Sequence, residues 1–137
     1  MTGPSRGLLD TSVFIAAENG RSLKEEGLPA ESAISVVTLA ELHAGVLAAR
    51  DTETRAVRMT TLDALADIQL IPVDDAAAVT WARMRVHLAE VGRRVGVNDP
   101  WIAASAAAHN LPVITQDNDF DLLESVAGLA IVRMCGG

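Results

Sequence analysis

The sequence has one cysteine, one lysine and no long apolar run. The single cysteine, Cys135, cannot form a disulfide within the chain, which favours a reducing, cytoplasmic setting. No apolar stretch approaches the roughly 18–20 residues that span a membrane. The N-terminal residues MTGPSRG lack the apolar core of a signal peptide, so we expect neither a secretory leader nor a membrane segment.

Positive charge is also scarce. Lys24 is the one lysine, and with it the chain carries 11 basic residues against 18 acidic ones, for a formal net charge of −7. This balance argues against a general basic nucleic-acid binder, because such proteins neutralise many phosphates with their own cations. It leaves room for a metal-dependent nuclease, in which bound cations and local arginines contact the phosphates.

Length and composition predict a single domain over residues 1–137. A chain of 137 residues can bury one hydrophobic core. Half of the residues are hydrophobic and the mean hydropathy is +0.26, which argues against a disordered chain. No repeat, low-complexity tract or interdomain linker is visible.

Short apolar segments alternate with helical patterns along the whole chain. Strands are expected at residues 7–9, 33–37, 69–73, 111–115 and 129–134. Helices are expected at residues 12–18, 38–49, 51–67, 75–91, 101–109 and 120–126, with a short helix or loop at 21–31. Pro72 indicates that the third strand lies at a sheet edge. The alternation predicts an α/β fold with a five-stranded parallel sheet and helices on both faces.

Four acidic residues are expected at one edge of this sheet. Asp10 and Asp117 follow the first and fourth strands, and parallel sheets bind ligands at the carboxyl ends of their strands. Glu41 and Asp99 are expected in first turns of helices that begin at the same edge. Each acid has an ordinary capping explanation, such as Asp10 as an N-cap or Glu41 in a capping box with Thr38. Their gathering at one edge is much less ordinary.

Closely packed carboxylates are unfavourable unless they are protonated or neutralised by cations. With no cysteine or histidine suitably placed, the oxygen ligands favour Mg²⁺ or Mn²⁺. Such ions keep water ligands and accept phosphate oxygens, and this is the equipment of metal-assisted phosphodiester hydrolysis. The pattern leaves one-metal and two-metal sites open.

A basic loop, residues 92–96, runs into this acidic region. Its Arg93 and Arg94 are the candidates for contact with RNA phosphates, although a solvated loop is an equally open interpretation. Asp99 follows, with Pro100 expected at the first helical position, where proline is favoured. Asp74 and Asp75 are interpreted as the capped start of a helix and are left out of the site.

Four motifs carry a resemblance to a known family. The segments LLDTSVF with Asp10, SVVTLAEL with Glu41, VNDPWIAASA with Asp99 and VITQDNDFDLL with Asp117 resemble those of PIN-domain ribonucleases, and within them VapC toxins. The motifs occur in the family's order and span nearly the whole chain. The resemblance implies a PIN-like three-layer fold and RNA cleavage that depends on Mg²⁺ or Mn²⁺. It also makes these four acids the catalytic and metal-binding residues.

The resemblance implies further residues and partners. Asp119 matches an accessory metal-binding acid. Thr11, Ser12 and Thr115 match small hydroxyl positions that bind a metal-bound water or orient a carboxylate. The expected partners are an RNA substrate and a small VapB-type antitoxin, in a homodimer or a toxin–antitoxin hetero-oligomer. The resemblance does not select an RNA.

Two other functional classes compete with this interpretation. One is a catalytically silent PIN-like module that binds RNA or regulates, against which the intact set of four acids counts. The other is an aspartyl-phosphate enzyme or receiver domain on a similar sheet. A phosphatase of that kind needs a second acid where this chain has Ser12, and a receiver needs a lysine after its last strand, whereas the one lysine is Lys24.

The helices expected at 38–49 and 51–67 form a candidate docking surface. As a hairpin they offer a hydrophobic groove for an amphipathic partner helix, or they pack wholly within the domain or a homodimer. An arginine of such a partner could pair with the acidic cluster and displace the metal.

Overall fold

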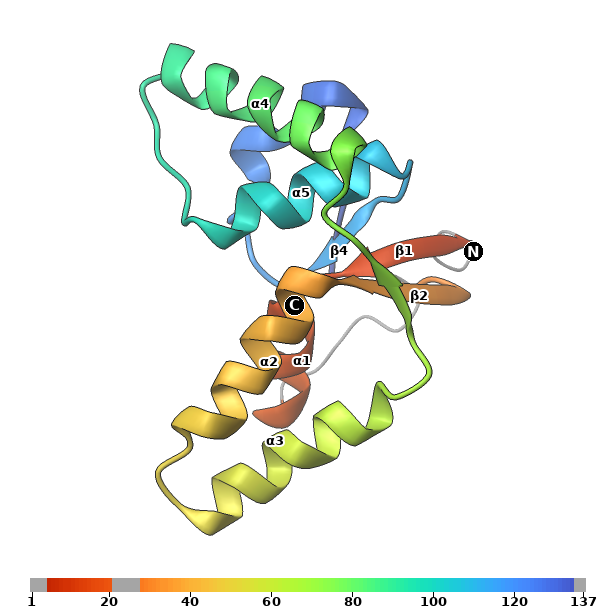
Figure 1. Ribbon diagram of the computed structural model, residues 1–137, viewed down its shortest axis with the longest axis vertical. Helices are drawn as coiled ribbons and strands as arrows, with labels where there is room; N and C mark the ends of the chain where they lie inside the picture. The colour runs from red at the N-terminus through yellow and green to blue at the C-terminus, as the bar shows by residue number, and fades with distance from the viewer. Residues whose placement is uncertain (1–4, 21–27, 135–137) are drawn as a thin grey trace.

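The computed structural model describes residues 5–20 and 28–134 and contains a five-stranded parallel sheet in the order β3-β2-β1-β4-β5 (Figure 1). The strands are β1 (Arg6–Leu9), β2 (Glu31–Ser35), β3 (Gln69–Ile71), β4 (Val113–Thr115) and β5 (Ile131–Arg133). The helices are α1 (Thr11–Glu18), α2 (Val36–Ala48), α3 (Thr52–Ala64), α4 (Asp75–Glu90) and α5 (Asn98–Ala108). The predicted fold class is confirmed; Cys135 and most of the segment 21–31 lie outside the described residues.

Helices cover both faces of the sheet because successive strand residues point to opposite sides. Leu8 and Val113 pack with residues of α4 and α5, and their neighbours Leu9 and Ile114 pack with residues of α1 and α2. Figure 1 shows the two helix layers on either side of the central strands. Strands that are covered on both faces have apolar residues at successive positions, so they appear in the sequence as short continuous apolar runs.

The start of α2 differs from the prediction. The helix begins at Val36, since the side chain of Ser35 accepts a 3.0 Å hydrogen bond from the backbone N–H of Val37. Thr38 therefore lies inside the helix, where it is fully buried, and is not the N-cap. The predicted capping box of Thr38 and Glu41 is wrong. Glu41 lies in the second turn, so it has no role in satisfying the helix terminus.

The start of α5 also lies earlier than predicted. Asn98 is the first helical residue, which puts Asp99 second and Pro100 third. Proline is accommodated there because the N–H groups of the whole first turn lack acceptors within the helix. Val97 precedes the helix without a side-chain capping bond.

The segment after β4 contains no α-helix where one was predicted at 120–126. Two short 3₁₀ turns, η2 (Asp121–Leu123) and η3 (Val126–Gly128), flank Ser125, whose φ of 72° breaks the helical path. Elsewhere, β3 is an edge strand as predicted, although Pro72 follows it rather than lying in it. None of the helices among the described residues is long and apolar enough to cross a membrane.

Candidate active site

Asp10 lies at the carboxyl end of the central strand β1 and is only 3% exposed. Its backbone N–H donates a 3.0 Å hydrogen bond to the carbonyl of Ile114 in β4. Its side chain accepts from the backbone N–H of Ser12, as the N-cap of α1, and from the hydroxyl of Thr115 at 2.6 Å. Burial raises the pKa of Asp10, and the nearby charge of Asp117 adds to the rise. The capping role and a place in the acidic site therefore coexist in one residue.

Two hydroxyl side chains connect β4 to α1. The Oγ of Ser12 lies 3.2 Å from Oγ1 of Thr115 and accepts a 2.9 Å hydrogen bond from the backbone N–H of Gln116. Oγ1 of Thr115 also lies 3.3 Å from Oδ1 of Asp117. The structure thus brings the three predicted hydroxyl residues to the acids, since Thr11 contacts Glu41.

Glu41 enters the site from α2. One carboxylate oxygen accepts a 2.6 Å hydrogen bond from the hydroxyl of Thr11, which lies 3.3 Å from the hydroxyl of Thr38. The other oxygen accepts from the side-chain amide of Asn98 at 3.3 Å. Asn98 is a site residue that the sequence did not predict; its position directly before Asp99 in the same motif was the one available indication. These bonds fix the carboxylate of Glu41 between α1 and α5.

The negative charges of the other acids all act on the carboxyl group of Asp99. Burial, followed by the negative charges of Asp119, Asp10, Glu41 and Asp117, raises the pKa of Asp99 to about 7. Only carboxylates that share one region can act on a single group in this way. The structure therefore brings together the four main acids, as the sheet-edge argument predicted, and with them Asp119, which the family resemblance implied.

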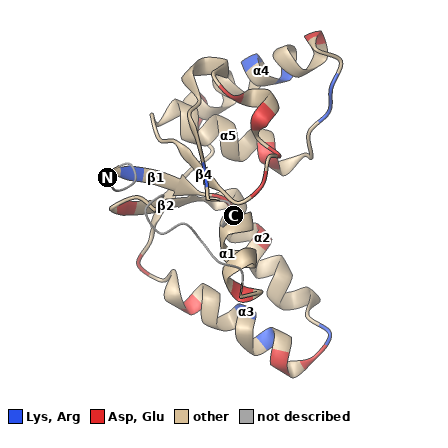
Figure 2. Cartoon of the chain, turned by 180° about the vertical axis from the view of Figure 1, so that it is seen from behind, with Lys and Arg blue, Asp and Glu red and all other residues tan. Residues whose placement is uncertain are grey.

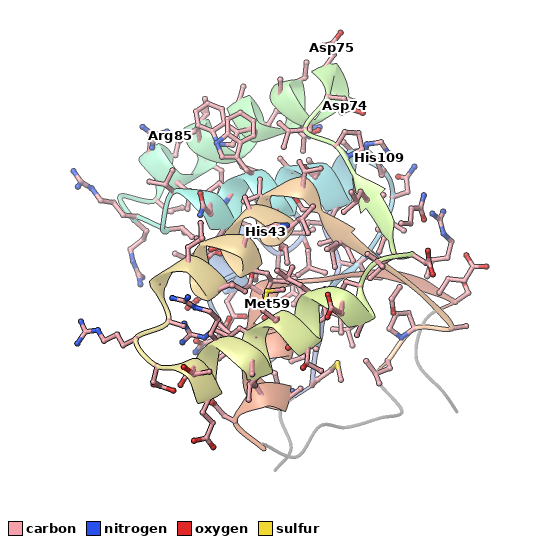
Figure 3. All side chains as sticks on the ribbon, turned by 60° about the horizontal axis from the view of Figure 1, so that its bottom comes forward. His43, Met59, Asp74, Asp75, Arg85 and His109 are labelled. Atoms are coloured by element: carbon pink, nitrogen blue, oxygen red, sulfur yellow. The ribbon has the colours of Figure 1, made fainter. Side chains whose placement is uncertain are left out.

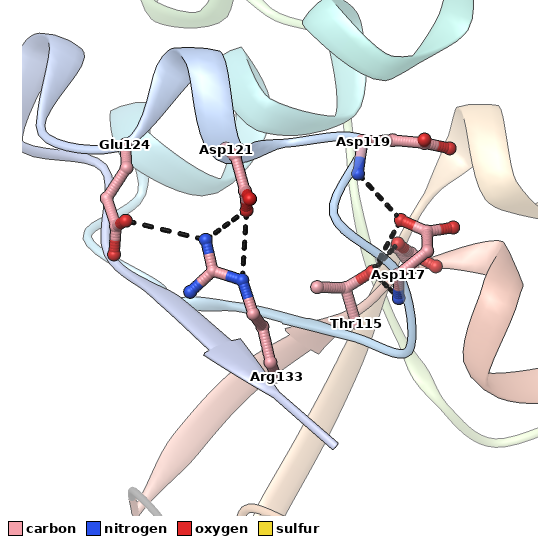
Figure 4. A network of polar contacts seen from close by, with 7 residues as sticks. Thr115, Asp117, Asp119, Asp121, Glu124 and Arg133 are labelled. Atoms are coloured by element: carbon pink, nitrogen blue, oxygen red, sulfur yellow. Dashed lines mark hydrogen bonds and ion pairs between the residues drawn. The ribbon is translucent and has the colours of Figure 1, made fainter. Parts of the chain in front are cut away.

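Asp117 and Asp119 belong to the loop after β4 (Figure 4). The backbone N–H of Asp119 donates a 3.0 Å hydrogen bond to Oδ1 of Asp117, and burial and the charge of Asp117 raise the pKa of Asp119. The charge of the next acid, Asp121, adds to the rise in the pKa of Asp119. Arg133 on β5 binds Asp121 through Nε at 2.9 Å and also reaches Glu124 at 3.4 Å.

No basic side chain within residues 5–20 and 28–134 pairs with the acidic cluster, which is defined here as Asp10, Glu41, Asp99, Asp117 and Asp119. The ion pairs in that part of the chain lie elsewhere; they join Arg6 to Glu31, His109 to Asp74, and Arg133 to Asp121 and Glu124. The cluster is thus held together by hydroxyl and amide donors and by the fold itself, against the repulsion of its own charges.

The donor set suits a hydrated divalent ion. In the described part of the chain, no three Asp, Glu, His or Cys side chains form a ready-made metal-binding group. Mg²⁺ retains several waters and is usually bound by only one or two carboxylates, so it does not need a closed protein cage. Carboxylate oxygens with neighbouring hydroxyls are the ligands that Mg²⁺ and Mn²⁺ prefer.

The basic loop adjoins the cluster. Arg93 and Arg94 line a hollow of about 530 Å³ together with Asp99 and Asp119. Figure 2 shows the basic positions on the connection between α4 and α5. The arginines therefore lie where a polyanion reaching the acids would pass.

Comparison with known proteins places this geometry in context. The model of the PIN domain family matches residues 7–125. Ribonuclease VapC5 of Mycobacterium tuberculosis is 58% identical over 97% of this chain and 98% of its own length, and ribonuclease VapC4 of the same organism is 39% identical over 92% and 97%. The crystal structure of VapBC-5, a member of the VapBC family of toxin–antitoxin systems from M. tuberculosis, aligns with a TM-score of 0.88 at 56% identity, covering 95% of this chain and 99% of that one.

Proposed function

We propose that the acidic cluster binds Mg²⁺ or Mn²⁺ and is the place where RNA is cleaved. The chain belongs to the PIN-domain family and is a VapC-type ribonuclease toxin of a type II toxin–antitoxin system. The carrying observation is that burial, together with the charges of four neighbouring carboxylates, raises the pKa of Asp99 to about 7, while none of these acids has an ion pair among the described residues. Such a site needs a cation at neutral pH. When bound, the ion supplies an acidified water and polarises the phosphate.

The hydrogen bonds around the cluster support this assignment. Asp10 is held by Thr115 and by the N-terminus of α1, and Glu41 is held by Thr11 and Asn98. Fixed carboxylates need little reorganisation when a cation or a developing charge arrives. Asp99 would hold its proton until a cation replaced it, because protons and metal compete for the same oxygens.

The experiment compares metal binding with RNA cleavage. We expect Asp10→Asn, Glu41→Gln, Asp99→Asn and Asp117→Asn each to weaken Mg²⁺ binding in calorimetry and to lower the cleavage rate by two or more orders of magnitude. Asp67→Asn is the matched control, since Asp67 is exposed and lines neither hollow that borders the cluster. Wild-type cleavage by Asp99→Asn would refute its catalytic assignment. RNA binding without metal binding or cleavage in the wild type would favour the silent PIN-like module.

Arg93 and Arg94 are proposed to contact phosphates of the bound RNA. They are exposed, they line the hollow that contains Asp99 and Asp119, and they bring positive charge to a strongly negative site. Phosphate contact by these arginines offsets the repulsion between the acidic cluster and the RNA backbone.

A small VapB-type antitoxin is the proposed partner, and the crystallised VapBC-5 relative is described as a member of a toxin–antitoxin family. Between α2 and α3 lies a hollow of about 530 Å³ whose lining is mostly apolar and includes Leu39, Leu47, Met59 and Leu62. His43 and Met59 mark its two sides in Figure 3, and Leu47 is 82% exposed. An amphipathic helix fits such a groove.

A second hollow, of about 220 Å³, borders the acids and shares no lining residue with the groove. It is lined by Thr11, Glu41 and Gly45 and by other residues of α1. A partner arginine placed there would reach Glu41 and compete with the metal for carboxylate oxygens.

Co-expression with the neighbouring upstream reading frame tests this partner. A small protein that copurifies and suppresses cleavage is expected, and Leu47→Lys should weaken its binding. Val79→Lys, at a position 66% exposed on α4, is the control that should leave binding intact. Equal loss with both variants, or a homodimer that fills the groove, would contradict the docking site.

A further inference from the structure

The two tryptophans of the chain stack on each other at the edge of the core. Trp81 on α4 and Trp101 on α5 have ring centroids 4.7 Å apart and planes 10° from parallel. Both rings are only partly buried, and both line a hollow of about 790 Å³. An aromatic pair that borders an open hollow presents indole surface to a ligand as well as to the protein.

The rest of the hollow is basic. Arg85, Arg93 and Arg94 line it, and no acidic residue is among its described lining residues. In the part of the chain that the structure describes, these three arginines form neither an ion pair nor a side-chain hydrogen bond. Three uncompensated cations around an aromatic pair are notable on a chain with a net charge of −7.

The aromatic hollow adjoins the acidic cluster. Arg93, Arg94 and the two residues after them line both this hollow and the hollow of Asp99. Asp99 and Trp101 are two residues apart in α5, which turns by about 100° per residue, so they lie on roughly opposite sides of the helix. A bound chain would pass from the tryptophans to the acids across the basic loop.

We propose that this hollow is a binding subsite for an unpaired RNA nucleotide next to the cleaved phosphate, with its base against the indole rings and its phosphates on the arginines. This inference rests on the proposed ribonuclease function and assigns one place on the protein to an unpaired nucleotide of the substrate. A flat aromatic surface stacks any unpaired base, and clustered arginines follow the backbone without reading sequence. The bases of a regular duplex are already stacked within it and do not reach the rings.

Tryptophan fluorescence gives a direct readout, since both tryptophans lie at the subsite. In metal-free buffer, where cleavage is prevented, we expect a short unpaired oligoadenylate to quench the emission and a blunt RNA duplex to bind at least tenfold more weakly. Arg85→Ala should weaken oligoadenylate binding about tenfold. Arg83→Ala is the matched control, because Arg83 is exposed on the same helix but does not line the hollow. Figure 3 shows Arg85 on α4, far from the Asp74 end of that helix.

Kinetics separate this inference from the function on which it rests. With Mg²⁺ and an unpaired RNA substrate, Arg85→Ala should raise KM about tenfold and leave kcat unchanged, as loss of uniform binding does. Trp101→Phe should retain part of the stacking, and Trp101→Leu should lose it; a melting curve for each shows whether the variant folds. Equal binding of oligoadenylate and duplex, or an unchanged KM in Arg85→Ala, would overturn the subsite alone. Quenching without any cleavage would sustain the subsite and overturn the proposed function.

Discussion

Oγ1 of Thr115 donates a 2.6 Å hydrogen bond to Oδ2 of Asp10, across 105 positions of the sequence. The same oxygen lies 3.3 Å from Oδ1 of Asp117, and the side chain of Thr115 is fully buried. A hydroxyl carries one proton, so it donates fully to one carboxylate at a time. Thr115 therefore fixes the spacing of two acids while it stabilises the charge of the more buried one.

Thr115→Val removes this hydroxyl with little change in volume. We expect the free energy of unfolding to fall by about 1–2 kcal/mol, because Asp10 loses a hydrogen bond in a buried position. The pKa of Asp10 should rise further, and RNA cleavage should fall roughly tenfold with a higher Mg²⁺ requirement. Thr115→Ser, which retains the hydroxyl, is the control and should keep most of the activity. A Val variant as active as the Ser variant would show that the hydroxyl does not position the acids.

Asp99→Asn should stabilise the metal-free protein at neutral pH. The pKa of Asp99 is about 7 in the folded state against 3.8 ordinarily, so between these values the folded state holds a proton that the unfolded state has lost. The contribution of that proton to the free energy of unfolding is fully present below about pH 4 and is lost as pH rises through 7. The variant should exceed the wild type by about 1–2 kcal/mol above pH 7, after allowance for partial exposure and solvent screening, and the two should converge near pH 4.

Urea unfolding at several pH values in the presence of a chelator measures this difference. Mg²⁺ should reverse the order, because it binds the folded wild type more tightly than the variant. A pH-independent difference between the two proteins would mean that the charge of Asp99 is not repelled by the cluster.

Changing both Arg93 and Arg94 to alanine should weaken RNA binding and flatten its salt dependence. On a single strand, each phosphate that an arginine no longer neutralises lowers the slope of log K against log salt by about 0.7, so the expected change is about 1.4. The double variant of Arg50 and Arg83, both exposed and away from the two hollows, removes the same charge and is the control. If both double variants gave the same slope of log K against log salt, Arg93 and Arg94 would belong to a solvated loop that does not contact the RNA.

Asp74→Ala tests the interpretation of this acid as a helix cap. Its carboxylate accepts a 2.9 Å hydrogen bond from the backbone N–H of Ala77 and pairs with His109 at 3.0 Å, and the first of these is the main cause that lowers the pKa of Asp74 (Figure 3). The stabilisation is present above about pH 4 and is lost as pH falls through the lowered pKa. The variant should melt a few degrees lower at pH 7, and this difference should shrink as pH falls below 4. Asp75→Ala, which removes a charge without that capping bond, should melt closer to the wild type; if it melts equally low, the general helix dipole is responsible.

The sequence predicted the sheet and the acids because both are marked locally. A short apolar run such as the one around Leu8 predicts a strand without reference to the rest of the chain, and Asp10 follows that strand directly. The start of α2 was misplaced because the β-branched residues Val36 and Val37 favour strands, whereas packing and the Ser35 cap make them helical. The contact of Asn98 with Glu41 joins residues 57 apart, and no local pattern announces such a pair.

The strand order has a consequence for the cell that makes this protein. The central strand β1 is synthesised well before its neighbour β4, to which the backbone N–H of Asp10 is hydrogen-bonded. An incomplete chain emerging from the ribosome lacks Asp117, Thr115 and the strand that holds Asp10 in place. The surroundings of Asp10 therefore cannot assemble before residues 113–117 have been synthesised.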